Sequence, residues 1–118
     1  MSQRIQQVNQ LIKKELSRII LKEVEFPAEV LATLTRVETS QDLEQAKVYI
    51  SVLPENQAER VLLILNRQIY ELQQKLNRRL KMRPIPRIYF IKEKETSKAG
   101  RVEEILEKIK VEKGGKRG

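Results

Sequence analysis

The sequence predicts an α+β domain in which helices cover one face of a small three-stranded sheet. Two long segments repeat apolar residues at helical spacing, and three short segments are rich in β-branched residues or alternate apolar with polar ones. Prolines and short polar runs separate these segments. The expected order is helix, strand, strand, one long helix or two helices, strand and helix, and 118 residues are the length of one domain.

The first predicted helix covers residues 3–22, where apolar residues recur on one side of a helical wheel. These residues are Ile5, Val8, Leu11, Ile12, Leu16, Ile19 and Ile20. Lys13, Lys14 and Arg18 fall elsewhere on the wheel, so the helix is amphipathic. We expect it to end just before Pro27, because proline disfavours helical geometry at the residue that precedes it.

Two strands are predicted next, over residues 31–39 and 46–53. The first is rich in Thr and β-branched residues, and the second alternates, so that its apolar residues share one face. Those residues are Ala46, Val48, Ile50 and Val52. The connection between the strands is short and polar, which favours antiparallel pairing. Within it, we expect Asp42 to accept backbone hydrogen bonds in a turn.

A long helix is predicted from residue 56 to residue 80, with Asn56 as its N-cap. Apolar residues recur along it at alternating spacings of four and three, which gives a heptad-like seam. The seam consists of Ala58, Leu62, Leu65, Ile69, Leu72 and Leu76. We expect the seam to pack on the sheet, because so few heptads make a poor coiled coil and the sheet needs a cover.

The third strand is predicted at residues 87–92, after Pro84 and Pro86 mark the end of the helical region. A last helix is expected over residues 99–111, with four apolar residues on one face. They are Val102, Ile105, Leu106 and Ile109. We expect one domain over residues 1–112, followed by a flexible basic tail over residues 113–118.

The composition argues against most catalytic and metal-binding classes of protein. The chain has no Cys and no His, and Asp42 is its one Asp. Disulfides, thiolate metal sites and Ser-His or Cys-His arrangements are therefore excluded. We expect no enzyme activity, no cofactor and no metal, and a nuclease or transferase built on Glu alone is disfavoured.

The sequence also lacks the signs of a membrane protein. Its longest aliphatic run, residues 61–65, is far shorter than a membrane span, and its first residues lack the apolar core of a signal peptide. We expect a cytoplasmic monomer that does not bind a membrane.

The net charge of +8 is concentrated in residues 67–87, which hold seven cations and one acid. A dense positive surface on a folded element is typical of a site that binds a phosphate backbone, because each Lys or Arg contact releases condensed counterions. Acids do not interleave with these cations, as they often do on a helix face that is merely solvated. The first candidates for phosphate contacts are Arg78, Arg79, Lys81, Arg83 and Arg87. Further candidates are Lys75, Arg67, Lys13, Lys14 and Arg18.

Three tyrosines could stack on nucleic-acid bases. Tyr49 and Tyr89 lie on predicted strands, where we expect them to pack against other residues. Tyr70 lies on the long helix and is expected to be exposed. Arg36 lies on a strand amid acids, so we expect it to form an ion pair rather than to bind a ligand.

Two segments carry a resemblance to a known family. Residues 35–53 read TRVETSQDLEQAKVYISVL and residues 80–90 read LKMRPIPRIYF, and in these and in their order the chain resembles ribosome-binding factor A. The resemblance implies a type II KH-like fold with an added C-terminal helix. It also implies a non-catalytic factor that binds the free 30S small ribosomal subunit, assists late maturation of 16S rRNA, and is released with the help of an assembly GTPase.

The chain departs from related patterns at two places. KH domains that bind single strands use a Gly-x-x-Gly loop, but the four glycines here are at positions 100, 114, 115 and 118. The family's Ala-x-Gly at an interhelix kink corresponds to residues 68–70, Gln-Ile-Tyr. The sequence therefore argues against a sharp kink, although Asn66 could end a first helix.

A second function stays open from the sequence alone. The apolar seam of the long helix could bind a partner protein, which would make the chain a structural or adaptor protein. Its basic charge would then serve only steering or solubility.

Overall fold

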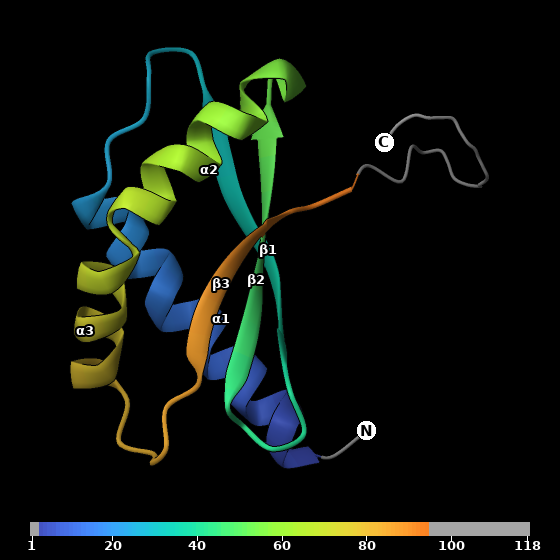
Figure 1. The fold of residues 1–118 in the computed structure, drawn as a ribbon, viewed down its shortest axis with the longest axis vertical. Helices are drawn as coiled ribbons and strands as arrows, with labels where there is room; N and C mark the ends of the chain where they lie inside the picture. The colour runs from blue at the N-terminus through green and yellow to red at the C-terminus, as the bar shows by residue number, and fades with distance from the viewer. Residues whose placement is uncertain (1–2, 95–118) are drawn as a thin grey trace.

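A computed structural model of the chain describes residues 3–94. Its elements follow the predicted order of helix, two strands, two helices and strand (Figure 1). They are α1 (Gln3–Glu23), β1 (Leu31–Thr39), β2 (Gln45–Leu53), a 3-10 turn (Glu55–Gln57), α2 (Ala58–Arg67), α3 (Ile69–Arg79) and β3 (Arg87–Lys92). The predicted α+β class is confirmed, while the predicted helix over 99–111 and the tail over 113–118 lie outside the described residues.

The three strands form one sheet in the order β1-β2-β3. Strands β1 and β2 pair antiparallel, as predicted, from Leu31 opposite Leu53 to Thr39 opposite Ala46. Strand β3 pairs with β2 in the parallel direction, with Gln45 opposite Arg87. A parallel neighbour needs a long crossover connection, and helices α2 and α3 supply it.

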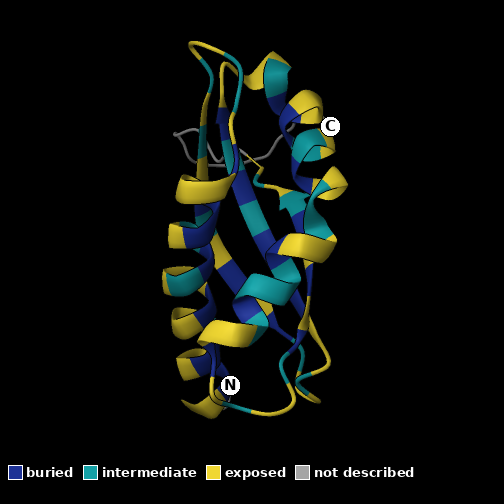
Figure 2. Cartoon of the chain, turned by 90° about the vertical axis from the view of Figure 1, so that its left-hand side faces the viewer, coloured by how far each residue is buried: buried dark blue, intermediate teal, exposed yellow. Residues whose placement is uncertain are grey.

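The helices all lie against the same face of the sheet. Helix α1 packs on β1 and on α3, and α2 packs on β2 and β3. The predicted apolar face of β2 is buried beneath them, from Ala46 to Val52. Figure 2 looks at the helical side and shows α1 with its exposed residues turned outward and its buried residues turned toward the strands. The main chain of Thr39 donates to Asn9 Oδ1 at 2.8 Å and so ties α1 to the end of β1.

Most of the predicted helical core is confirmed, with one exception on α1. Ile12, Leu16 and Ile19 are at most 1% exposed. Leu11, which the helical wheel places on the apolar side, is 39% exposed instead. It lies at the margin of the buried stripe, where Val8 and Ile12 already fill the contact with the sheet and with α3.

The apolar seam of the long helical region belongs to the core. Ala58, Leu65, Leu72 and Leu76 are buried, and Leu62 and Ile69 are half-buried against them. This confirms the expectation that the seam covers the sheet. The apolar seam is therefore not available to bind a partner protein, as the adaptor alternative required.

The helical region is interrupted at Gln68, contrary to the expectation of no sharp kink. Helices α2 and α3 run in different directions on either side of this residue (Figure 1). The Gln68 amide donates to the carbonyl of Leu65, three residues back, and its own carbonyl then accepts from Leu72 to begin α3. Because Gln68 has φ −110°, the break needs no glycine, which explains why the missing Ala-x-Gly gave a misleading signal.

The connection between β1 and β2 forms the turn expected around Asp42. Its carboxylate accepts from the Ser40 hydroxyl at 2.6 Å and from the main chain of Glu44 at 3.0 Å. These hydrogen bonds favour the charged form and hold the pKa of the Asp42 carboxyl below its ordinary value. The turn role predicted for Asp42 is confirmed.

Candidate nucleic-acid interface

The end of α3 and the segment that follows it bring four cations together. Arg78 and Arg79 occupy the last turn of the helix, and Lys81 and Arg83 follow after the chain becomes extended at Leu80. Leu80 is buried, whereas the four cations are exposed. The apolar residue thus anchors the turn, and the charged residues around it face solvent. We call these four residues the helical cluster.

Gln73 fixes the position of the segment that carries Lys81 and Arg83. Its side-chain amide donates to the carbonyl of Pro86 and to Asn77 Oδ1, both at 3.1 Å. Its side-chain oxygen accepts from the main chain of Ile88 at 2.9 Å. One side chain of α3 therefore holds both the end of the connection and the start of β3. The apolar pattern gives no signal for this role, because Gln73 is one of several similar polar residues on the helix.

Three of the candidate cations are paired with acids from α1. Arg79 Nη1 lies 3.2 Å from Glu15 Oε1, and Lys75 Nζ lies 3.7 Å from Glu23 Oε2. Glu15 also lies 4.0 Å from the guanidinium of Arg18. The absence of interleaved acids along residues 67–87 therefore does not mean that these cations lack acidic partners. The acids that pair with Arg79 and Lys75 lie far earlier in the chain, on α1, which no local sequence pattern indicates.

The remaining helical candidates keep their positive charge uncompensated. Within residues 3–94, no carboxylate pairs with any of six exposed cations. These are Lys13, Lys14, Arg67, Arg78, Lys81 and Arg83. Arg83 is oriented by its own chain, because its guanidinium donates to the carbonyls of Leu80 and Met82 at 3.2 and 2.6 Å. Ion pairing thus divides the ten candidates into compensated and uncompensated groups.

Arg87 is separated from the helical cluster. The next residue, Ile88, is fully buried beneath the helices, so alternation along β3 directs Arg87 to the opposite face of the sheet. The structure therefore divides the ten predicted contacts between two faces, nine on the helical side and one on the open face of the sheet.

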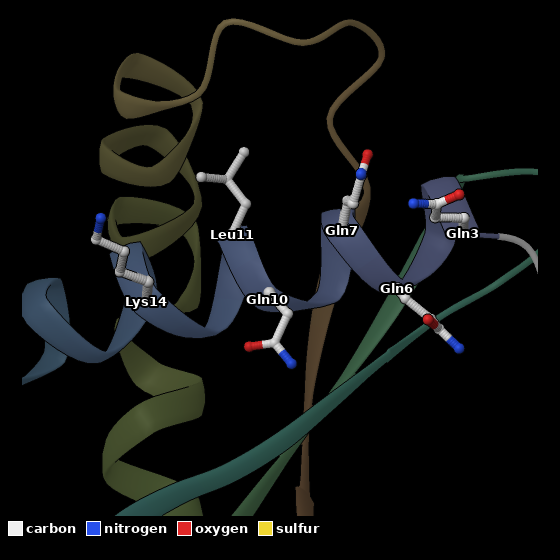
Figure 3. Close-up of a pocket in the computed structure, with 6 residues that line it drawn as sticks. All are labelled: Gln3, Gln6, Gln7, Gln10, Leu11 and Lys14. Carbon is white, nitrogen blue, oxygen red and sulfur yellow. The ribbon is translucent and has the colours of Figure 1, made fainter.

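Helix α1 adds uncharged polar groups beside its lysines. A shallow pocket along its outer side is shown in Figure 3, in which Leu11 and Gln7 point to one side of the helix and Gln6 and Gln10 to the other. The lining residues are Gln3, Gln6, Gln7, Gln10, Leu11 and Lys14. Side-chain amides carry both donors and an acceptor, so they can form hydrogen bonds with sugar hydroxyls or base edges. The recurrence of glutamine along one helix was a signal that could have identified this surface.

Two of the three expectations for tyrosine are confirmed. Tyr70 is 73% exposed on α3, as predicted. Tyr49 packs beneath Arg36, whose guanidinium carbon lies 3.8 Å from the centre of the ring. The expectation for Tyr89 was wrong, because this side chain is 38% exposed on the open face of the sheet. Position on a strand predicted burial, but only one face of this sheet is covered.

The ion pair predicted for Arg36 is confirmed. Its guanidinium pairs with Glu38 on the same strand and with Glu93, whose Oε1 lies 3.0 Å from Nε. The hydrogen bond to Glu93, together with the nearby carboxylates, raises the pKa of Arg36 despite the opposing effect of partial burial.

The described residues contain neither a cluster of potential metal ligands nor a helix that could span a membrane. Residues 3–94 do not gather three acidic side chains around a possible metal position. No helix in this part of the chain is long and apolar enough to cross a membrane.

Comparison with known proteins places the chain in a family. The model of the family described as ribosome-binding factor A matches residues 4–106. The chain belongs to the ribosome-binding factor A family. Ribosome-binding factor A of Nitrosococcus oceani is 32% identical over 106 residues, which cover 89% of this chain and 84% of the relative.

Solved structures of ribosome-binding factor A share the fold. The crystal structure of the Thermus thermophilus protein matches with a TM-score of 0.66 and 27% identity, over 75% of this chain and 94% of that one. A Thermus thermophilus homology model fitted into a cryo-EM map of a complex with the 30S subunit matches with a TM-score of 0.57 and 30% identity, over 69% of this chain and 86% of that one. The chain therefore shares its overall fold with these structures of ribosome-binding factor A.

Proposed function

We propose that this protein is a non-catalytic ribosome assembly factor that binds the free 30S subunit and assists late maturation of 16S rRNA. Membership in the ribosome-binding factor A family supports this function, as does the fitting of the Thermus thermophilus relative into a map of a 30S complex. The protein acts in the cytoplasm as a monomer, and an assembly GTPase promotes its release from the subunit.

The observation that carries the proposal is the uncompensated charge of three of the four residues of the helical cluster. Arg78, Lys81 and Arg83 lie close together along the chain at the end of α3 and pair with no acid among residues 3–94. Folded rRNA presents closely spaced phosphates, and each contact with such a cation releases condensed counterions. Lys13 and Lys14 on the neighbouring helix α1 extend the contact, and the glutamines of α1 form hydrogen bonds to sugars or base edges.

The test is sedimentation of the full-length protein with free small subunits, large subunits and whole ribosomes. Wild type is expected to migrate with free small subunits alone. The Arg78→Glu, Lys81→Glu double variant is expected to lose this migration, because two contacts become repulsive. A double variant with the same change in net charge, Lys22→Glu with Arg60→Glu, changes exposed cations outside the helical cluster and should still bind.

Each other outcome argues against a specific part of the proposal. Equal migration with every fraction would reduce the protein to a general binder of polyanions. Binding that survives in the Arg78→Glu, Lys81→Glu variant would exclude the helical cluster as the interface. Cleavage of rRNA by the purified protein would contradict the non-catalytic role.

A further inference from the structure

The face of the sheet opposite the helices carries a second group of side chains. Where β2 and β3 pair, Gln45 lies opposite Arg87 and Lys47 lies opposite Tyr89. All four alternate with residues buried beneath the helices, so they project from the open face. No helix among the described residues covers this face, because α1, α2 and α3 lie on the other side of the strands (Figure 1).

The part of the open face around Arg36 is already occupied by contacts among its own side chains. Arg36 lies over the Tyr49 ring and pairs with Glu38 and Glu93. The Tyr49 hydroxyl donates to Glu38 at 3.1 Å, and the Thr35 hydroxyl donates to Glu93 at 2.7 Å. The charged groups and the aromatic ring here already interact with one another, so few of them are available to bind a ligand.

The part of the open face around Tyr89 has cations that lack acidic partners. Glu38 lies opposite Lys47 across the strands, but its carboxylate is engaged by Arg36 and by Tyr49. Lys47 and Arg87 are exposed, and neither pairs with a carboxylate within residues 3–94. Between them the ring of Tyr89 is 38% exposed. An exposed ring flanked by two uncompensated cations matches a ligand that has both a flat aromatic face and negative charge.

We propose that Tyr89, Lys47 and Arg87 form a site for an unpaired nucleotide of single-stranded RNA. The base stacks on the Tyr89 ring, and the flanking phosphates contact the two cations. Lys47 lies opposite Tyr89 on the neighbouring strand, about 4.8 Å away, and Arg87 lies two residues from Tyr89 along β3, about 7 Å away. Both cations therefore reach the edges of a nucleotide that is stacked on Tyr89. This site lies on the opposite face from the helical cluster and does not depend on the proposed function.

The test is titration of the full-length protein with fluorescently labelled hexauridylate and hexaadenylate at low salt. It is performed in the Arg78→Glu, Lys81→Glu background as well as in wild type, so that binding at the helical cluster is not counted. We expect Tyr89→Ser to weaken binding about tenfold in the Arg78→Glu, Lys81→Glu background and by less in wild type, since the substitution removes the ring on which a base stacks. Tyr89→Phe, which keeps the ring, should bind as wild type does.

Matched measurements separate stacking from general attraction. Tyr70→Ser removes a more exposed tyrosine on α3 and should leave hexanucleotide affinity unchanged. The Lys47→Gln, Arg87→Gln double variant should reduce the log–log salt slope by about 1.4, or about 0.7 for each phosphate contact with a single strand. In NMR spectra, the ring protons of Tyr89 should shift on titration while those of Tyr49 move less, because Arg36 covers that ring.

Three outcomes would overturn the site. Wild-type affinity in Tyr89→Ser, or an unshifted Tyr89 ring, would show that no base stacks there. Equal losses in Tyr70→Ser and Tyr89→Ser would show that binding has no preference for the open face. A hexaglutamate peptide that binds as well as RNA and responds only to the cation variants would identify an acidic protein segment as the ligand instead.

Discussion

Glu93 joins the end of β3 to β1 through hydrogen bonds that favour its charged form. Partial burial opposes ionisation, but hydrogen bonds from Arg36 and from the Thr35 hydroxyl outweigh it, and the pKa of Glu93 lies below its ordinary value. A pKa that is lower in the folded than in the unfolded state means that ionised Glu93 stabilises the fold above the unfolded pKa. That contribution is lost as the pH falls from the ordinary glutamate value of about 4.3.

Replacing Arg36 by Met should therefore raise the pKa of Glu93 toward its ordinary value. The guanidinium supplies hydrogen bonds that favour the carboxylate, and Met preserves much of the aliphatic stem. A carbon-detected NMR titration of the Glu93 carboxyl measures the change, with Arg60→Met as the control on α2. An unchanged Glu93 pKa in the Arg36→Met variant would contradict this account.

The same contacts predict how stability depends on pH. Wild type should lose more stability than Glu93→Gln between about pH 5 and pH 3, because only wild type must protonate a carboxylate that the fold favours in its charged form. Urea denaturation at several pH values measures this difference. Parallel pH profiles for the two proteins would show that Glu93 makes no such contribution.

At the scale of elements, α3 both covers the sheet and positions the basic segment. Leu72 and Leu76 bury its inner side, while Gln73 connects it to Pro86 and Ile88. The helix is 11 residues long, too short to be stable alone, so its place depends on these tertiary contacts.

Gln73→Ala should cost about 1–2 kcal/mol of stability. The substitution leaves the Ile88 amide and the Pro86 carbonyl without their partner, and a net hydrogen bond contributes about 1 kcal/mol. Urea denaturation measures the loss, with Gln74→Ala as the control at the neighbouring position. Equal stability of the two variants would show that the hydrogen bonds from Gln73 to Pro86 and Ile88 do not stabilise the fold.

Leu72→Ala should cost about 2–5 kcal/mol, because Leu72 is 1% exposed and its removal leaves a cavity. Leu63→Ala removes the same side chain from a position that is 53% exposed and should cost under about 1 kcal/mol. Thermal or urea denaturation compares the two. A small loss at Leu72 would argue that α3 is only loosely attached to the sheet.

The elements could be predicted from the sequence because each depends on local periodicity. Apolar residues alternate from Ala46 to Val52 because one face of the strand is buried, and they recur at helical spacing in α1 because one side of the helix faces the core. The break at Gln68 could not be predicted from glycine, since its backbone has negative φ. Of the candidate site, the clustering of cations could be predicted because it is local in the sequence. The pairing of Arg79 with Glu15 and the exposure of Tyr89 could not, because they depend on which elements meet in space.

At the scale of the whole molecule, cations lie on both faces of the sheet, and each face holds cations that are paired with acids and cations that are not. On the helical side Arg79 and Lys75 are matched by acids of α1, whereas Arg78 and Lys81 pair with no acid among residues 3–94. A paired cation must exchange its carboxylate for a phosphate, so it gains less on binding than an unpaired one.

The salt dependence of small-subunit binding should reflect this difference. With about five phosphate contacts, the log–log slope for wild type is expected near about −4. Lys81→Gln should make the slope less steep by the amount that one phosphate contact contributes. Arg79→Gln should change the slope less, because Glu15 already compensates the charge of Arg79. Binding measured at several salt concentrations separates the two variants, and an equal change in both would argue that the ion pair opens fully on binding.

The parallel pairing of β2 with β3 has a consequence for the growing chain. Ile50 pairs with Lys92, so one edge of β2 has no partner strand until β3 is synthesised about 40 residues later. At about 5–20 residues per second, a ribosome needs about 2–8 seconds to synthesise that partner. During this interval the hairpin of β1 and β2 exposes an unpaired edge to other nascent chains, and the sheet closes only when the last described strand has left the ribosome.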